Sequence, residues 1–188
     1  MRLVHLNGPP GIGKSTLSAL YADRHPGALN LDVDSLHRLV GGWQDLEIHV
    51  LRVLWPVALA MATAHLHGGR DVVVPQYLAQ LDGITAFEDV ARDQGAEFRE
   101  VVLLDSRKGS IERFDHRAQH DDDPWVQHSR RFIALHGGPA RLGSMYDALL
   151  EIKRLRPAAL VVKSKPGAVE ETYGLVTEAL GGTWGAAS

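Results

Sequence analysis

Short apolar runs recur along the chain, with room for a helix between them. They occupy residues 2–7, 27–32, 71–75, 100–105 and 159–163. Each run is rich in Val or Leu and lacks apolar–polar alternation, which is typical of a strand buried on both faces of a parallel sheet. Strands that alternate with helices require crossover connections. The pattern therefore predicts an α/β fold with three layers around a five-stranded parallel sheet.

Two of the intervening segments show helical spacing. Leu17, Leu20 and Tyr21 would share one face of a first helix. A second helix would carry its apolar face on Ile48, Leu51, Trp55, Ala58 and Leu59. Pro56 lacks a backbone N–H and is predicted to kink this second helix or to mark a boundary between two helices.

The segment at 107–132 breaks this rhythm, because it is polar and rich in arginine. It falls between the fourth and fifth apolar runs. Its acidic run followed by Pro124 predicts the start of a helix, with Asp123 as the cap and Pro at the first helical position. We expect this insertion to form a mobile, arginine-rich lid within a single domain that spans residues 1–188.

Composition narrows the possible partners and location. Twenty basic residues against 23 acidic ones give a net charge of −3, which argues against binding to nucleic acid or to an anionic membrane. There is no cysteine, so disulfides, a thiolate nucleophile and a Cys-based zinc site are excluded. The apolar run at the N-terminus is too short for a signal peptide, and the one at 53–64 is too short to span a bilayer. We expect a cytoplasmic protein.

The segment "GPPGIGKS", from Gly8 to Ser15, matches the phosphate-binding motif G-x-x-x-x-G-K-[ST] in full. It follows a predicted strand and opens a predicted helix, which is the context that the motif requires. Backbone N–H groups of such a loop point at phosphates, Lys14 would reach the β- and γ-phosphates, and the Ser15 hydroxyl would ligate Mg²⁺. We therefore expect ATP and Mg²⁺ as cofactors, held by Gly8, Gly11, Ile12, Gly13, Lys14, Ser15 and Thr16.

Two carboxylates follow the second predicted strand, in the sequence "LDVDSL". In open α/β sheets, ligands bind outside the carboxyl ends of the strands, so Asp32 and Asp34 are expected to face the phosphates. Phosphoryl transfer needs a metal ion held and an attacking hydroxyl oriented and deprotonated, and a carboxylate suits each task. Alternatively, Asp34 only caps a helix that starts near Ser35.

Together, "GPPGIGKST" and "LDVDSL" resemble the small P-loop kinases. These include shikimate, gluconate and adenylylsulfate kinases, and especially the chloramphenicol phosphotransferase and tunicamycin-resistance types. The resemblance covers the first 40 residues well and the rest only by the order of elements. It implies that Asp34 is the catalytic base that binds the acceptor hydroxyl, and that Asp32 lies near the magnesium ion.

The same resemblance implies roles for later residues. Lid arginines clamp phosphates in such kinases, which makes Arg113 and Arg117 candidate catalytic residues. Arg130 and Arg131 are weaker candidates. The loop after the fifth strand packs beside adenine in such kinases, so Lys165 and Pro166 would line the base site unless they belong to a plain strand-to-helix loop.

The third predicted strand departs from the family pattern. Many relatives end this strand with an acidic residue that helps to hold magnesium, whereas here Pro75 and Gln76 follow it. Gln76 and Tyr77 are then expected to contact substrate at the mouth of the cleft, or to form an ordinary turn. Arg38, His37 and Trp43 are expected either to face the acceptor or to have only a structural role in the core or on the surface.

These observations predict an ATP-dependent kinase that transfers the γ-phosphoryl group to a hydroxyl of a small molecule, such as an antibiotic, a nucleoside or a sugar. The alternative is a regulatory nucleotide-binding P-loop NTPase that acts through a protein partner, which the missing acid after strand three keeps open. The acidic charge balance disfavours a third possibility, a polynucleotide-end kinase. We expect a monomer or a homodimer.

Overall fold

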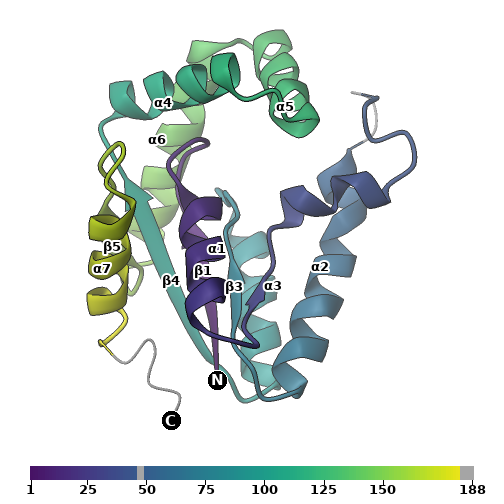
Figure 1. Ribbon diagram of the computed structural model, residues 1–188, viewed down its shortest axis with the longest axis vertical. Helices are drawn as coiled ribbons and strands as arrows, with labels where there is room; N and C mark the ends of the chain where they lie inside the picture. The colour runs from purple at the N-terminus through teal and green to yellow at the C-terminus, as the bar shows by residue number, and fades with distance from the viewer. Residues whose placement is uncertain (46–48, 183–188) are drawn as a thin grey trace.

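The computed structural model describes residues 1–45 and 49–182. Its centre is one sheet of five parallel strands in the order β2-β3-β1-β4-β5 (Figure 1). The predicted five-stranded parallel sheet is therefore confirmed. The strands are β1 (Arg2–Asn7), β2 (Leu29–Asn30), β3 (Val72–Val74), β4 (Glu97–Leu104) and β5 (Leu160–Lys163).

The edge strand β2 is much shorter than the predicted run at 27–32. It pairs only with β3, through Leu29 opposite Val72 and Asn30 opposite Val73. Because β3 has three residues, it offers few backbone groups for pairing. The chain beyond β2 turns at once into a 3₁₀ helix, η1 (Val33–Leu39), which carries the second carboxylate of the predicted site.

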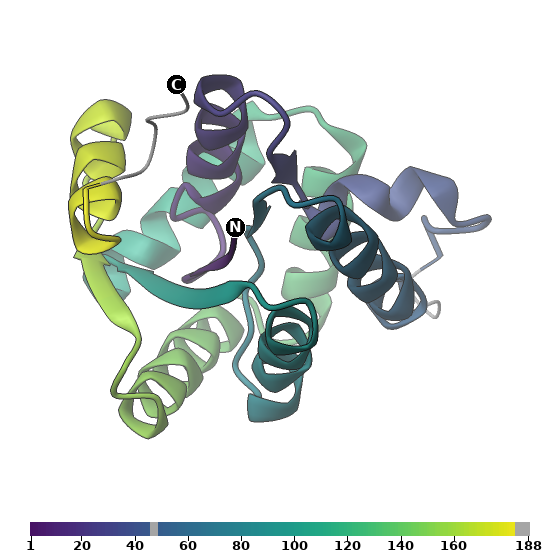
Figure 2. The ribbon, with the colours of Figure 1, turned by 90° about the horizontal axis from the view of Figure 1, so that it is seen from below.

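Helices cover both faces of the sheet, as predicted. One face packs against α1 (Lys14–Arg24) and α7 (Val169–Ala179), and the other faces α3 (Leu81–Asp93) and α6 (Pro139–Leu155) (Figure 2). Neighbouring residues of β1 pack on opposite faces of the sheet, because Leu3 belongs to one core cluster and Val4 to the other. The core thus consists of two apolar layers separated by the sheet.

The second predicted helix is one continuous element, α2 (Val50–His67), with Pro56 inside it. The predicted boundary at Pro56 is therefore wrong. Buried residues at a spacing of four, namely Leu54, Ala58 and Ala62, hold the helix against the core on both sides of the proline. Leu51 lies on the exposed side, and Ile48 falls outside the described residues.

By length and composition alone, α2 is also apolar enough to cross a membrane. Its buried residues, however, pack in the same cluster as β3 and α3. Only 28% of the span is buried, so α2 packs against the core through one face and exposes apolar residues such as Val53 and Val57 on the other.

The arginine-rich segment forms two helices, α4 (Arg107–His120) and α5 (Pro124–Leu135). They lie across the carboxyl ends of the strands, above the loop that joins β1 to α1 (Figure 1). The predicted start of α5 is confirmed. Asp123 is the cap, its Oδ1 accepts from the backbone N–H groups of Trp125 (2.8 Å) and Val126 (3.4 Å), and Pro124 opens the helix.

Candidate active site

The loop between β1 and α1 is shaped by glycines. Gly8 has φ +150°, and a Cβ there would lie 2.8 Å from the carbonyl oxygen of Leu103 in β4. Gly13 precedes the first turn of α1 at φ +107°; no side chain caps this helix and its first turn holds no acidic residue. The first N–H groups of α1 therefore remain available, which is the arrangement that binds phosphate at a helix N-terminus.

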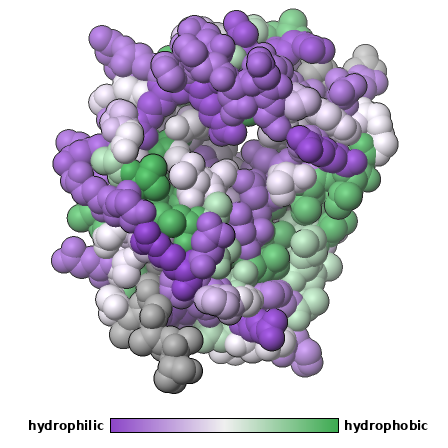
Figure 3. Space-filling model, viewed as in Figure 1, coloured by the Kyte–Doolittle hydropathy of each residue, from purple (hydrophilic) through white to green (hydrophobic). Residues whose placement is uncertain are grey.

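A cavity of ≈ 1220 Å³ opens at this end of the sheet. Its walls come from the phosphate loop, η1, the end of β3, the start of α2, and the α4–α6 helices. The phosphate-loop residues that line it are Pro10, Gly11, Gly13, Lys14, Ser15 and Thr16. Figure 3 shows the molecule hollowed beneath a hydrophilic cover at the α4–α5 end. Gly8 and Ile12 do not line the cavity, and Ile12 is buried in the core.

Lys14 is held at the floor of the cavity by the phosphate loop itself. Its Nζ donates hydrogen bonds to the carbonyl oxygens of Gly8 (2.8 Å) and Pro9 (3.0 Å), and only 8% of the residue is exposed. Burial lowers the pKa of Lys14 to about 8, although the nearby Asp34 and Asp32 act to raise it. The ammonium group and the two carboxylates thus belong to one electrostatic cluster.

Asp32 and Asp34 both line the cavity, with distinct local roles. Asp32, not Asp34, caps η1, because its Oδ1 accepts from the backbone N–H of Asp34 at 3.2 Å. The carboxyl group of Asp34 remains in the cavity. Burial and the neighbouring Asp32 raise the pKa of Asp34, while hydrogen bonds from Trp125 and Gln76 and the charge of Lys14 oppose that shift. A carboxylate of raised pKa suits proton acceptance.

An aromatic cluster joins η1 to α5 beside Asp34. The ring of His37 stacks on Trp125, with centroids 4.7 Å apart, and meets Trp43 edge-on at 4.3 Å. Trp125 also stacks on His128 at 5.2 Å. His37 is bound to the backbone as well, through its Nδ1 and the carbonyl oxygen of Asp34. The cluster joins the η1 side of the cavity to the α4–α5 segment.

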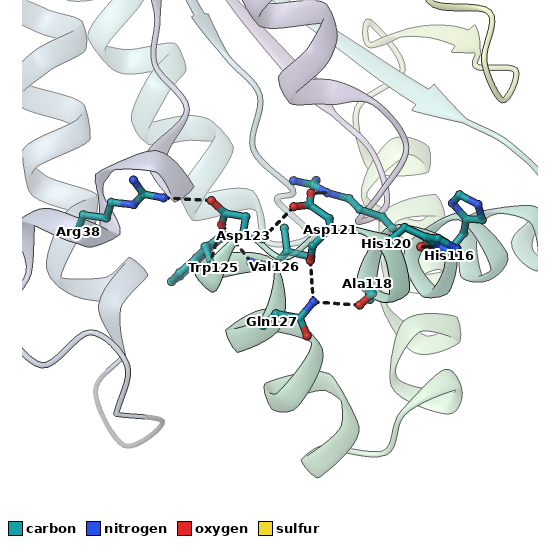
Figure 4. A network of polar contacts seen from close by, with 10 residues as sticks. Arg38, His116, Ala118, His120, Asp121, Asp123, Trp125, Val126 and Gln127 are labelled. Atoms are coloured by element: carbon teal, nitrogen blue, oxygen red, sulfur yellow. Dashed lines mark hydrogen bonds and ion pairs between the residues drawn. The ribbon is translucent and has the colours of Figure 1, made fainter.

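Polar contacts extend this junction outward (Figure 4). Arg38 of η1 pairs with Asp123 at the start of α5. Arg117 of α4 pairs with Asp121 at 3.2 Å, and Gln127 Nε2 donates to the carbonyl oxygens of Ala118 (3.1 Å) and Asp121 (2.6 Å). Arg38 and Arg117 both line the cavity, so each predicted role at the site competes with an existing ion pair.

Gln76 and Tyr77 also line the cavity, next to Pro75 at the end of β3. Gln76 Nε2 lies 3.5 Å from Asp34 Oδ1, and the residue is 6% exposed. Its Oε1 is buried and has no hydrogen-bond partner among the described residues. The Tyr77 hydroxyl donates to the carbonyl oxygen of Met145 in α6 at 2.9 Å, and burial raises the pKa of Tyr77 to about 12. Gln76 therefore keeps one buried amide oxygen unpaired beside Asp34.

Arg113 and Arg117 lie four residues apart on α4 but make different contacts. The Arg113 guanidinium donates to the Ile12 carbonyl oxygen (3.0 Å) and to Ser164 O (3.0 Å) and Oγ (3.1 Å), and it pairs with Asp105 at 3.2 Å. It does not line the cavity, whereas Arg117 does. Arg113 is thus placed to fasten the phosphate loop to the loop after β5.

Four other candidates lie apart from the cavity. Lys165 and Pro166 are exposed and do not line it, and Lys165 Nζ pairs with Glu171 Oε1 at 2.6 Å. The exposed Arg130 and Arg131 of α5 do not line it either. Ser164, which directly precedes Lys165, does contact the phosphate loop, because its Oγ donates to the Ile12 carbonyl oxygen at 3.0 Å.

Several lining residues were not predicted. Trp125 and His128 come from α5, and Arg52 and Arg141 come from the first turns of α2 and α6. Arg52 had a usable signal, because it is the only Lys, Arg, Asp or Glu within the apolar helix α2. Trp125 directly follows the predicted Asp123–Pro124 helix start.

The fold and the family comparisons agree. The family model described as an AAA domain matches residues 3–134. The tunicamycin resistance protein of Deinococcus radiodurans superimposes with a TM-score of 0.60, at 17% identity, over 96% of this chain and 95% of that one. A putative kinase from Chloroflexus aurantiacus gives 0.65 at 20% identity, over 95% and 97%.

A gluconokinase from Sinorhizobium meliloti gives a TM-score of 0.55 at 20% identity, over 95% of both chains. No protein of curated function matches the chain. At these identities the solved structures show a shared fold, and the family match covers most of the chain. The chain belongs to the AAA domain family and has the fold of its small P-loop kinases.

Proposed function

We propose that this protein is an ATP-dependent phosphotransferase that phosphorylates a hydroxyl of a small molecule. One observation carries the proposal: the phosphate loop and the partly buried Asp34 line the same cavity. A nucleotide phosphate and an acceptor hydroxyl can therefore meet inside one cavity. The solved structures named as kinases share this fold, which supports the reaction class.

The phosphate loop fits a nucleoside triphosphate. The uncapped N-terminus of α1 offers backbone N–H groups, and Lys14 supplies a positive charge at the same point. Ser15 and Asp32 are the residues that would hold Mg²⁺, since both line the cavity and offer oxygen ligands. When bound, the ion would neutralise charge on the β- and γ-phosphates.

Asp34 is the proposed general base. The acceptor oxygen attacks the γ-phosphorus, the bond from that phosphorus to the β,γ-bridging oxygen breaks, and ADP leaves. The hydroxyl proton passes to the Asp34 carboxylate. Gln76 Nε2, 3.5 Å from that carboxylate, would hold it in position for the acceptor, and Arg117 lies on the cavity wall, where it would meet phosphate charge.

The α4–α5 segment is the proposed lid. It contributes Phe114, Arg117, Trp125 and His128 to the cavity wall, so its closure would exclude water. Water is the competing acceptor in phosphoryl transfer. Arg38, through Asp123, would help to hold the lid against η1.

The test is ADP release and product mass with ATP, Mg²⁺ and a panel of hydroxylated antibiotics, nucleosides and sugars. One panel member should gain a single phosphate. Asp34→Asn should lower its turnover by about 10²- to 10⁴-fold, because the base is lost, while the control Asp93→Asn on the exposed end of α3 should not. ATP binding without any phosphorylated acceptor, together with an unaffected Asp34→Asn, would instead favour the regulatory NTPase that acts through a protein partner.

A further inference from the structure

A second cavity, of ≈ 690 Å³, adjoins the first one. The two share Leu51, Arg52, Gln76, Tyr77, Arg141 and Met145 in their walls. The second cavity contains no residue of the phosphate loop and neither of the paired aspartates. It extends instead between α2, the loop after β3 and the start of α6. A molecule whose hydroxyl lies at Asp34 would therefore extend past Gln76 into this space.

Charge is unevenly distributed along this path. Among the arginines that line the first cavity, Arg38 pairs with Asp123 and Arg117 pairs with Asp121. Arg52 and Arg141 have no ion-pair partner within the part of the chain that the structure describes. The second cavity has one carboxylate in its wall, Asp82, against these two guanidinium groups. The shared wall is therefore net positive.

The backbone adds to that positive potential. Arg52 lies in the first turn of α2 and Arg141 in the first turn of α6, and neither first turn holds an acidic residue. Helix N-termini carry partial positive charge, so a cation there is unfavourable unless an anion compensates it. Arg141 is also close enough to Tyr77 to act against the rise in the pKa of that hydroxyl. Two arginines from separate helices thus face the same cleft.

The remaining wall suits the body of a small organic molecule. Trp55, Leu78 and Ala148 provide apolar surface in the second cavity. Gln76 is only 6% exposed and lies in the wall common to both cavities, and its buried Oε1 has no hydrogen-bond partner among the described residues.

We infer that the acceptor carries an anionic group, a carboxylate or a phosphate ester, which Arg52 and Arg141 bind while its hydroxyl lies at Asp34. This inference rests on the proposed kinase function and names its substrate class. Arginine binds carboxylates and phosphates through paired N–H donors. Both arginines also line the first cavity together with the phosphate loop, so the test must separate binding of the acceptor from binding of ATP.

The test uses matched pairs of compounds that differ only in charge: glucose against gluconate, glucose against glucose 6-phosphate, and a nucleoside against its 5′-monophosphate. Binding is measured by calorimetry with the phosphate loop filled by Mg²⁺ and a non-hydrolysable ATP analogue. Turnover is measured separately with ATP. An anionic member should bind and react better than its neutral partner by about tenfold or more, the effect of a charged hydrogen-bonded contact.

The variant Arg52→Gln/Arg141→Gln should remove that preference and raise the acceptor KM, with the ATP KM unchanged. Arg154→Gln, at the opposite end of α6 and paired with Glu151, is the matched control and should keep the preference. Arginine-dependent binding without phosphate transfer would uphold the anion site and refute the kinase. Equal turnover of neutral and anionic members, or a preference that survives in the double variant, would overturn the inference and leave the kinase standing. Absence of arginine-dependent binding across the panel would also overturn it.

Discussion

Arg38 of η1 and Asp123 at the start of α5 form an ion pair, with Nη2 3.1 Å from Oδ2. The pair connects the carboxylate-bearing helix to the α4–α5 segment across the cavity. Asp123 has a second role as the cap of α5, so charge and capping can be separated by substitution.

We predict that Asp123→Ala lowers the free energy of unfolding by about 1 kcal/mol, because the cap of α5 is lost. Asp123→Asn keeps an acceptor for the cap, and Arg38→Gln removes only an exposed ion pair. Each of these substitutions should therefore change the free energy of unfolding by less than about 0.5 kcal/mol. Urea unfolding measures all three. A loss with Arg38→Gln as large as with Asp123→Ala would show that the ion pair, rather than the cap, stabilises this junction.

A second prediction separates the two α4 arginines. Arg113→Ala should lower the free energy of unfolding by about 3 kcal/mol, because it leaves Asp105 and the Ile12 carbonyl without their largely buried partner. Arg117→Ala should lower it by about 0.5 kcal/mol or less, since its pair with Asp121 is half exposed. Turnover should fall in both variants, and in Arg117→Ala without loss of fold. Equal stability losses in the two variants contradict this assignment.

The contrast between these arginines shows where sequence reasoning reached its limit. The spacing of Arg113 and Arg117 correctly predicted one helical face, but spacing does not say what that face meets. The side of α4 near residue 113 abuts the phosphate loop, and a Cβ on Gly11 would lie 3.1 Å from the backbone of Phe114. The packing of α4 therefore decides that Arg113 contacts the backbone of the phosphate loop, whereas Arg117 lines the cavity.

Other parts of the fold were predictable because their signals are local. Runs of Val and Leu predicted the strands, although the edge strands β2 and β5 are only partly buried. The glycine-rich motif predicted the loop before α1, and Asp123 with Pro124 predicted the start of α5. The second cavity had no such signal, since its wall combines α2, the loop after β3 and α6. Residues that are far apart in sequence, such as Arg52 and Arg141, meet there only through tertiary structure.

A third prediction concerns pH and stability. Burial lowers the pKa of His5 from 6.5 to about 4, so the folded state keeps His5 neutral while the unfolded state protonates it below about pH 6.5. Between these values the unfolded state binds more protons, and the free energy of unfolding falls as the pH is lowered. The full effect is about 3 kcal/mol at pH 4, and above pH 6.5 it vanishes.

Urea unfolding at several pH values between 4 and 7 measures this slope in the wild type and in His5→Gln. The variant lacks the titrating ring, so its slope should be shallower by the His5 contribution, whatever its absolute stability. Parallel slopes in the two proteins would show that His5 is not the group responsible.

A fourth prediction compares two glycines of the phosphate loop. Both have positive φ, so alanine strains the backbone at either site by about 1 kcal/mol. At Gly8 the new Cβ would also meet Leu103 O at 2.8 Å, whereas at Gly13 nothing lies within 4 Å. Thermal unfolding should therefore show a clearly larger loss of stability for Gly8→Ala than for Gly13→Ala, and similar losses would refute the close approach to β4.

The strand order has a consequence for how the chain folds during synthesis. The central strand β1 pairs with β3 at residues 72–74 and with β4 at residues 97–102, so neither partner exists when β1 leaves the ribosome. Such distant pairing slows folding and prolongs the exposure of apolar strands. Because Gly8 rests against Leu103, the nucleotide site cannot take shape until more than half of the chain has been made. Before that point, the loop proposed to hold the phosphates of a nucleotide is not formed, so nucleotide binding could not stabilise the nascent protein.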